Sequence, residues 1–215
     1  MKFDKTVLFK GIDENDCNRM IECFNAKIEK YRSGEIITDS AAESKKLRLV
    51  LSGRLVRVKY DINGNRTIIE QFEKNDLIGV PLEENERRWD TEIICEAASE
   101  MMLIEYSEIT KRCSKACMCH TIVVENLLEV MSKKTVALRD RVDVLSQRSI
   151  SGKLMRYLQL IDEKKTGNKY SEIPFSITEL SDYLCVNRSA LQRTIKKLTE
   201  NGELEFEHRK FRIKK

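Results

Sequence analysis

The sequence predicts an α+β protein: an N-terminal β-roll of the jelly-roll (double-stranded β-helix) type, then one long helix, then a C-terminal winged helix-turn-helix. Three patterns support this fold class. Short alternating stretches punctuated by glycine occupy residues 31–110, an apolar stripe at helical spacing continues to about residue 147, and two short helical segments precede two small strands near the C-terminus. Short strands separated by turn residues are typical of small rolls and sandwiches.

Length and composition fit two folded domains. The chain has 215 residues, of which 41% are hydrophobic and 34% charged, as in ordinary globular proteins. We expect a first domain over residues 1–147, whose last part is a long helix over about 111–147, and a second domain over residues 148–215.

Alternation of apolar and polar residues predicts the strands of the first domain. Residues 47–51 place leucines at every second position between charged or small neighbours, and residues 55–60 and 67–72 alternate likewise. The pair Asn63-Gly64 separates the last two stretches. An Asn-Gly pair in this setting predicts a hairpin whose two central turn residues adopt positive φ.

An apolar stripe at alternating steps of four and three residues predicts the long helix. The other faces are charged, so a helix this long and amphipathic needs a partner. Self-pairing into a two-fold dimer is the economical solution, and packing on its own β-domain is the alternative. The predicted dimer stripe consists of Val124, Leu128, Met131, Thr135, Leu138, Val142 and Leu145.

The segment that begins at Ser176 predicts a helix-turn-helix. Ser176 followed by Glu179 is a capping box that starts one short helix, Cys185-Val186 forms the turn, and Asn187 caps a second helix. Two small strands then surround residues 207–210 as a wing.

The second helix exposes basic and amide side chains near its start. Recognition helices read bases with such leading residues, because Arg and Gln can donate or share two hydrogen bonds with a base edge in the major groove. We expect base contacts from Arg188, Ser189, Gln192 and Arg193, and phosphate contacts from Lys196, Lys197, Arg209 and Lys210.

The distribution of charge supports nucleic acid as a partner. Residues 148–215 contain 15 Lys and Arg against 9 Asp and Glu, a net charge of +6, whereas residues 1–147 carry −2. Only two histidines occur, and the chain lacks GxSxG, HExxH and P-loop motifs, so no enzyme is predicted.

Nearly the whole chain resembles the Crp/Fnr superfamily of bacterial transcription regulators. The resemblance lies in Val50–Leu55, Asn63-Gly64 and Asp76–Gly79, which are similar to the family's cyclic-nucleotide-binding-like β-roll, and in Cys185–Arg193, which is similar to its turn and recognition helix. It implies a homodimer on a near-palindromic site in double-stranded DNA, with half-sites roughly 34 Å apart. Arg188, Ser189 and Arg193 would then be the main base readers.

Departures from the family pattern concern the effector. Family members that bind cyclic nucleotides carry a glutamate after the phosphate-loop glycine and an arginine shortly after, but here Gly79 precedes Val80, and Trp89 aligns with the arginine. The residues therefore do not favour a cyclic nucleotide. The expected effector pocket contains Gly79, Val80, Leu82, Trp89 and Thr91.

Seven cysteines offer an alternative sensor. Cys113, Cys117 and Cys119 lie together near the start of the long helix, so a redox, metal or iron–sulfur response is one open alternative. Cys17 belongs to an apolar helical face, and Cys95 and Cys185 are interpreted as core residues.

The remaining expectations concern location and partners. The N-terminus resembles no signal peptide and no stretch is apolar enough to span a membrane, so we expect a cytoplasmic protein. RNA polymerase would be a partner if the protein activates transcription. A ligand-binding module that acts on protein partners is the alternative of a different class.

Overall fold

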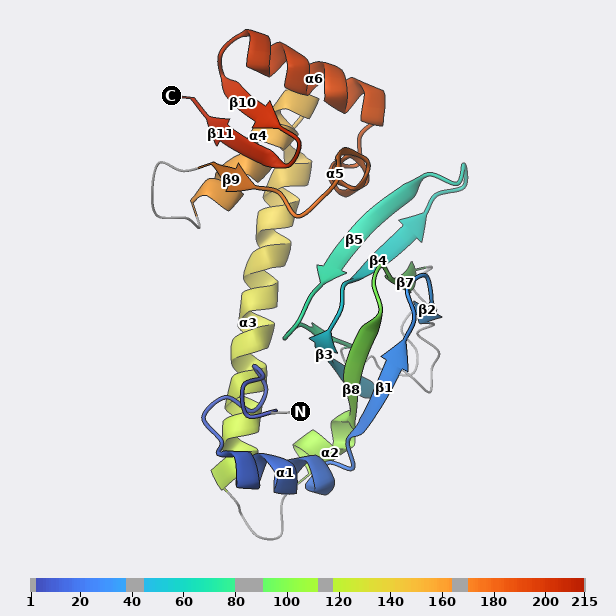
Figure 1. Ribbon diagram of the computed structural model, residues 1–215, viewed down its shortest axis with the longest axis vertical. Coiled ribbons are helices and arrows are strands. Elements are labelled where there is room, and N and C mark those ends of the chain that lie inside the picture. The colour runs from blue at the N-terminus through green and yellow to red at the C-terminus, as the bar shows by residue number, and fades with distance from the viewer. Residues whose placement is uncertain (1–2, 38–44, 80–90, 112–117, 164–169, 215) are drawn as a thin grey trace. The chain divides into compact units, whose positions relative to one another are not determined.

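The computed structural model describes residues 3–37, 45–79, 91–111, 118–163 and 170–214 (Figure 1). The chain packs as two compact units, one of Met1–Asn65 with Ile69–Lys133 and one of Arg66–Ile68 with Lys134–Lys215. The predicted boundary between residues 147 and 148 lies at the end of the long helix, whereas the packing divides inside that helix.

Two four-stranded sheets form the β-roll. One has the order β1 (Lys27–Tyr31), β8 (Ser99–Glu105), β3 (Lys46–Ser52), β6 (Leu77–Ile78). The other has the order β2 (Ile36–Ile37), β7 (Thr91–Cys95), β4 (Leu55–Tyr60), β5 (Arg66–Phe72). The recorded registers of both sheets are antiparallel, as expected of a jelly roll.

The two faces of the β3-containing sheet contribute to separate apolar cores. The inner core lies between the sheets and includes Val50, Phe72 and Met101. The outer core includes Leu49 and residues of α1 (Glu14–Cys23), α2 (Tyr106–Thr110) and the first part of α3 (Met118–Ser146). Strand β3 is therefore covered on both sides.

This double cover changes the environment of Arg48. Arg48 alternates with Leu47 and Leu49 along β3, and it is 0% exposed. It lies opposite Ile78 and Leu103, two members of the inner core. A buried guanidinium is costly unless its N–H groups are hydrogen-bonded, so this position demands hydrogen-bond acceptors inside the roll.

The predicted β4–β5 hairpin is present, but its turn differs from the expected one. The loop Asp61–Asn65 has five residues, and only Gly64 among them has positive φ, at +77°. Gly64 N–H donates to the Asp61 carbonyl at 3.0 Å, and the Asp61 carboxylate accepts from the amides of Asn63 and Asn65, each at 2.8 Å. These bonds stabilise a longer turn than the primed two-residue type.

Helix α3 has two apolar faces. Val123, Leu127 and Val130 are buried in the outer core of the first unit. The predicted dimer stripe overlaps this face in part, because Val124 and Met131 also pack against the outer core, as the alternative of packing on the β-domain implies. Its members Leu128, Thr135, Leu138 and Val142 are exposed, and Val124, Met131 and Leu145 are half-buried. The helix was predicted from about residue 111, but Lys111 has an extended backbone that ends α2, and residues 112–117 lie outside the described ranges.

The described part of the second unit contains three further helices and a small sheet. The helices are α4 (Ile150–Asp162), α5 (Ile177–Leu184) and α6 (Arg188–Glu200). The sheet has the order β10 (Leu204–Glu207), β11 (Lys210–Ile213), β9 (Ser171–Glu172), and β9 was not predicted. Leu154, Leu158, Leu180, Leu184, Leu191 and Phe211 are each 0% exposed and form its core. No helix in the described part of the chain is long and apolar enough to cross a membrane.

We predict that Gly53→Ala destabilises the β-roll by about 2–4 kcal/mol, because φ is +98° there and a Cβ would lie 2.6 Å from Ser99 Cα. Gly64→Ala is the matched control, since φ is also positive but nothing lies within 4 Å of its Cβ, and it should cost about 1 kcal/mol. Urea denaturation measures both. Equal losses would contradict the steric explanation for Gly53.

Candidate nucleic-acid interface

Helix α5 begins at the predicted capping box. The Ser176 hydroxyl accepts from Glu179 N–H at 3.3 Å, and the Glu179 carboxylate accepts from Ser176 N–H at 2.6 Å. These two bonds satisfy backbone donors that a helix start leaves free. Leu180 and Leu184 bury the inner side of α5, and Ile177 is half-buried. The sequence therefore fixes where α5 starts and which side faces the core.

The turn between α5 and α6 contains a strained residue. Cys185 adopts the left-handed conformation, with φ 54° and ψ 53°, at the C-terminus of α5. Its interpretation as a core residue is wrong, because the residue is exposed. Helices commonly end in this conformation, but glycine is the residue that adopts it without a steric cost.

Asn187 starts α6 by capping its backbone. Its side-chain oxygen accepts from Ser189 N–H at 3.0 Å and Ala190 N–H at 3.3 Å, and also from the Ser189 hydroxyl at 2.7 Å. The predicted cap is confirmed. The bond to the Ser189 hydroxyl holds that side chain at the first turn of the helix.

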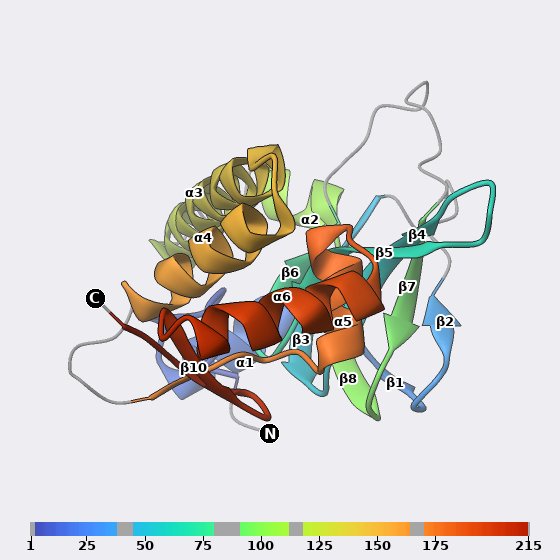
Figure 2. The ribbon, with the colours of Figure 1, turned by 90° about the horizontal axis from the view of Figure 1, so that it is seen from above.

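The two faces of α6 differ in polarity. Leu191 and Leu198 are buried and Ile195 is half-buried, whereas every residue predicted to contact DNA from this helix is exposed. In Figure 1, α6 lies uppermost in the second unit, with the β10–β11 hairpin beside one of its ends. Figure 2, seen from above, shows α6 in the foreground. The exposed set on α6 is Arg188, Ser189, Gln192, Arg193, Lys196 and Lys197.

Most of the basic side chains of this surface are not paired with a carboxylate among the described residues. Within the described ranges, Arg188, Arg193, Lys197, Arg209 and Lys210 form no ion pair, and Lys196 only approaches Glu200 at 3.7 Å with both side chains exposed. An exposed pair of this kind is weak and screened by salt. The surface is therefore available to an anionic partner.

The wing and α6 line a shared cleft. The wing turn comprises His208 and Arg209, and His208 has φ 55°. A shallow cleft of about 410 Å³ is lined by Gln192 and Lys196 from α6 and by Phe206 and His208 from the wing. His208 was not among the predicted site residues; its position in the loop between two short strands was the available signal.

The carboxylate of Glu205 pairs with two basic side chains of the wing sheet. Glu205 accepts from the Tyr170 hydroxyl at 2.7 Å and pairs with Arg212 and Lys214, each at 2.9 Å. The Tyr170 and Lys214 hydrogen bonds lower the pKa of Glu205 to about 2. Arg212 and Lys214 are thus engaged within the sheet, and the basic wing residues without an ion pair in the described part of the chain are Arg209 and Lys210 at its tip.

Only part of the expected effector pocket can be placed. Val80, Leu82 and Trp89 lie outside the described residues. Gly79 has φ +100°, and a Cβ there would lie 2.5 Å from the Lys46 carbonyl oxygen, so this glycine permits close approach of two strands. Thr91 is half-buried at the start of β7.

Two of the five described cysteines are buried. Cys95 is buried, as predicted. Cys17 is also buried, and burial together with nearby carboxylates raises its pKa to about 11, which keeps the thiol protonated. Cys119 lies 3.5 Å from Asp16, whereas Cys113 and Cys117 lie outside the described residues. Among the side chains that the structure places, no three His, Cys, Asp or Glu could hold a metal ion.

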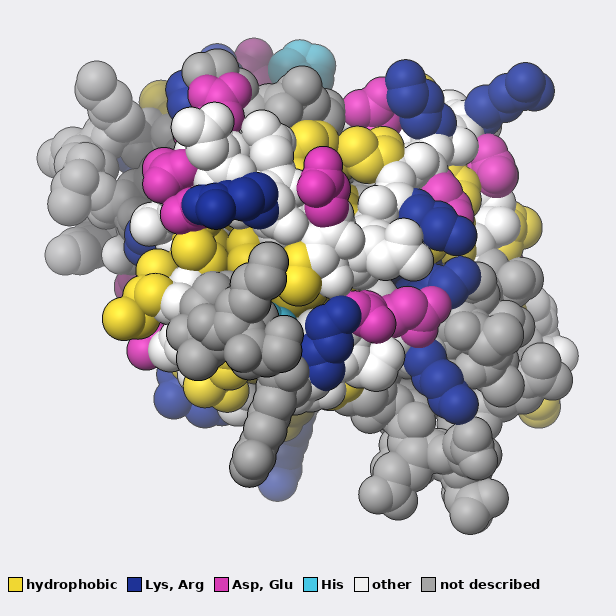
Figure 3. All heavy atoms as spheres, turned by 90° about the horizontal axis from the view of Figure 1, so that it is seen from below, with side chains coloured by type: hydrophobic (Ala, Val, Ile, Leu, Met, Phe, Trp, Pro, Cys, Tyr) yellow, Lys and Arg dark blue, Asp and Glu magenta, His cyan; other side chains and the backbone are white. Residues whose placement is uncertain are grey.

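The face shown in Figure 3 differs from α6 in charge pattern. Lys and Arg side chains are interspersed there with Asp and Glu, rather than gathered by sign. On α1 and α2 of the first unit, Arg19 pairs with Asp16 and Lys111 with Glu108. A mixed surface of this kind gives no strong field toward one sign of ligand.

Solved structures resemble the chain along almost its whole length. The c-di-GMP responsive global regulator CLP of Xanthomonas campestris is 15% identical with a TM-score of 0.68, over 92% of this chain and 99% of that chain. TTHA1359, a transcriptional regulator of the CRP/FNR family from Thermus thermophilus, is 12% identical with a TM-score of 0.59, over 88% and 94%. A cyclic nucleotide-binding domain containing protein from Listeria monocytogenes is 12% identical with a TM-score of 0.72, over 93% and 97%.

These likenesses establish the fold. The chain has the mixed helix and sheet fold of Crp/Fnr transcription regulators, as the resemblance in the sequence implied. No protein-family model matches the chain, and no curated protein matches its sequence.

We predict that Cys185→Gly stabilises the second unit by about 0.5–1 kcal/mol, because it removes the cost of a side chain in the left-handed region. Cys185→Ala is the control: it removes the sulfur but keeps the Cβ, so stability should change little. Urea denaturation followed by far-UV circular dichroism compares the three proteins. A gain with Ala as large as with Gly would assign the effect to the thiol instead.

Proposed function

We propose that the chain is a Crp/Fnr-type transcription regulator that binds a near-palindromic site in double-stranded DNA as a homodimer. The observation that carries this proposal is the exposed first half of α6, where Arg188, Gln192 and Arg193 project from a capped helix without a carboxylate partner among the described residues. A helix presented in this way fits the major groove.

The side chains at the start of α6 suit base recognition. An arginine can donate two hydrogen bonds to O6 and N7 of guanine, and a glutamine can pair with N6 and N7 of adenine. Arg188 and Ser189 lie in the first turn, and Gln192 and Arg193 lie one turn later. The spacing of about one turn places both pairs on neighbouring positions of the same groove.

The remaining basic residues suit phosphates. Lys196 and Lys197 follow along α6, and Arg209 and Lys210 occupy the tip of the wing. Lysine and arginine at the edges of a groove-bound helix add affinity that depends on salt and is independent of sequence. The cleft between Lys196 and His208 would then lie over the DNA backbone.

Self-association would cover the stripe on α3. Leu128, Leu138 and Val142 are 62%, 51% and 67% exposed, at the spacing of a coiled-coil seam. A two-fold axis along this seam would present two copies of α6, as a palindromic site requires.

In this proposal the β-roll senses a signal other than a cyclic nucleotide, and no cofactor is assigned. A cytoplasmic location and contact with RNA polymerase, if the protein activates transcription, complete the proposal. A module that acts on protein partners instead would lack specific affinity for duplex DNA.

The test is a selection of sites from random duplex DNA at fixed salt with the purified, reduced, full-length protein. We expect a two-fold symmetric site with half-sites about one helical turn apart. On that site, Arg188→Ala should weaken binding by about 1–3 kcal/mol and relax the preference at one base pair. Lys196→Ala should weaken binding to all sequences alike.

The control is Arg139→Ala, which removes the same charge from an exposed position of α3. It should leave the base preference unchanged. Equal losses on specific and random DNA for Arg188→Ala would refute its base-reading role. The selection is repeated with oxidant, iron and cell extract added if the protein alone binds DNA without sequence preference and with a strong dependence on salt. If no preferred sequence is selected under those conditions either, the regulator proposal is wrong.

We predict that Leu138→Glu weakens dimerisation at least about 100-fold, because an unpaired buried charge costs about 3–5 kcal/mol. Val136→Glu is the matched control, since Val136 is also exposed on α3, at 47%, but lies off the stripe. Analytical ultracentrifugation measures both. A Leu138→Glu protein that dimerises as tightly as wild type would exclude this seam.

A further inference from the structure

The corner between α3 and α4 determines the direction in which the second unit continues from the long helix. Helix α3 ends at Ser146 and α4 begins at Ile150, so three residues make the corner. Residues 134–162, which include it, belong to one compact unit and are all described. None of the corner residues was assigned a functional role from the sequence.

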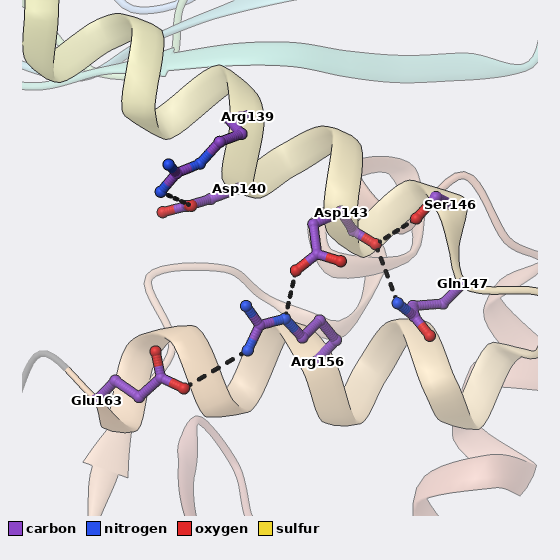
Figure 4. Close-up of polar contacts among 7 residues, drawn as sticks. All are labelled: Arg139, Asp140, Asp143, Ser146, Gln147, Arg156 and Glu163. Atoms are coloured by element: carbon purple, nitrogen blue, oxygen red, sulfur yellow. Dashed lines mark hydrogen bonds and ion pairs between the residues drawn. The ribbon is translucent and has the colours of Figure 1, made fainter.

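One ion pair spans the corner. The guanidinium Nε of Arg156, in the second turn of α4, donates to Asp143 Oδ2 of α3 at 2.5 Å, and its Nη1 lies 3.5 Å from Glu163 (Figure 4). The Asp143 carboxylate also raises the pKa of Arg156. Because the two residues are 13 apart in sequence and lie on different helices, this contact constrains the angle between them.

The backbone of the corner is held from both sides. The Asp143 carbonyl accepts from the Ser146 hydroxyl at 2.8 Å and from the Gln147 amide at 3.2 Å, which secures the last turn of α3 (Figure 4). On the other side, the Ser149 hydroxyl accepts from Gly152 N–H at 3.0 Å and starts α4. A connection of three residues between two hydrogen-bonded helix ends leaves few backbone dihedral angles free to change.

Two further contacts connect the ends of α3 and α4 to α5, the first helix of the helix-turn-helix. Arg141 of α3 lies over the Tyr183 ring of α5, with its guanidinium carbon 4.0 Å from the ring centroid, and donates to the Tyr183 carbonyl at 3.2 Å. Lys153 of α4 donates to the Leu184 carbonyl at 3.3 Å. The end of α3 is thus tied to α4 and, through both helices, to α5.

A small change at the corner has a large effect at α6. Helix α4 has 13 residues and is therefore about 20 Å long. A rotation of about 10° at one end of a rod of this length moves the other end by about 3.5 Å, close to the rise of one base pair. The stripe residues Leu138 and Val142 lie on the same segment of α3 as Asp143, so the corner relates the dimer seam to the position of α6.

We propose that Asp143 and Arg156 are positioning residues that set the spacing between the two DNA half-sites. By holding the angle between α3 and α4, their ion pair fixes the separation of the two copies of α6 in the dimer. This inference rests on the proposed function, because a separation exists only in a homodimer that binds DNA.

The experiment is a site selection with the full-length protein on a library in which the spacer between two half-sites varies by single base pairs. Wild type should favour one spacer at least about tenfold over spacers one base pair longer or shorter. Arg156→Gln and Asp143→Asn should each reduce that preference to about threefold or less. The preferred bases within each half-site should stay the same, because α6 is untouched.

Further variants separate positioning from folding. The double variant Asp143→Asn with Arg156→Gln should resemble each single variant, since residues that act through one contact are not additive. Arg156→Lys should recover most of the spacer preference because it keeps the charge. Arg139→Gln, which removes an exposed arginine paired with Asp140 on the same helix at 3.5 Å, is the matched control and should match wild type. Circular dichroism verifies the fold of each protein.

The outcomes are distinguishable. A wild-type protein that selects a symmetric site, together with folded single variants that keep the wild-type spacer preference, would overturn the positioning role and leave the proposed function intact. A wild-type protein that selects no symmetric site would overturn both. Loss of spacer preference in Arg139→Gln as well would assign the effect to net charge rather than to the corner.

Discussion

The proposed dimer and its DNA site depend on helix α3, which has one buried and one exposed apolar face. Val123, Leu127 and Val130 are buried against the β-roll, while Leu128, Leu138 and Val142 remain exposed on another face. We propose that a second copy covers the exposed face, because burying apolar side chains at seam spacing removes apolar surface from water. The dimer that we propose, the symmetry of its DNA site and the separation of the two reading helices all follow from that exposed face.

The basic side chains of the wing sheet and of α6 differ in whether they form ion pairs. Glu205 engages Arg212 and Lys214 inside the wing sheet, whereas the basic residues of α6 and of the wing tip lack ion pairs with the rest of the described chain, apart from a weak contact of Lys196. The unpaired basic side chains of α6 therefore begin at its capped first turn, with Arg188. Caps also matter for precision, since Asn187 holds both the first backbone amides and the Ser189 hydroxyl. Phosphate contacts give affinity, and rigid side chains on a fixed helix give base preference.

Much of the fold and of the site could be predicted because it is encoded in short stretches. The capping box at Ser176, the cap at Asn187 and the exposure of Arg188 depend on residues at most four positions apart. The hairpin after β4 was also predicted, although its turn has five residues, because Asp61 adds side-chain hydrogen bonds that lengthen it. The effector pocket stays a prediction, since three of its five residues lie outside the described residues.

The sequence by itself determined the order of the elements, the capped starts of α5 and α6, and the chemistry of the exposed face of α6, because periodicity and capping act over a few residues. Tertiary structure alone decided that Arg48 is buried, that Cys185 is exposed and that Asp143 meets Arg156. Each of these depends on what covers a strand, how a turn bends or how two helices cross. Such facts arise from long-range packing, where residues distant in sequence compete for the same space, and local pattern carries no record of the outcome.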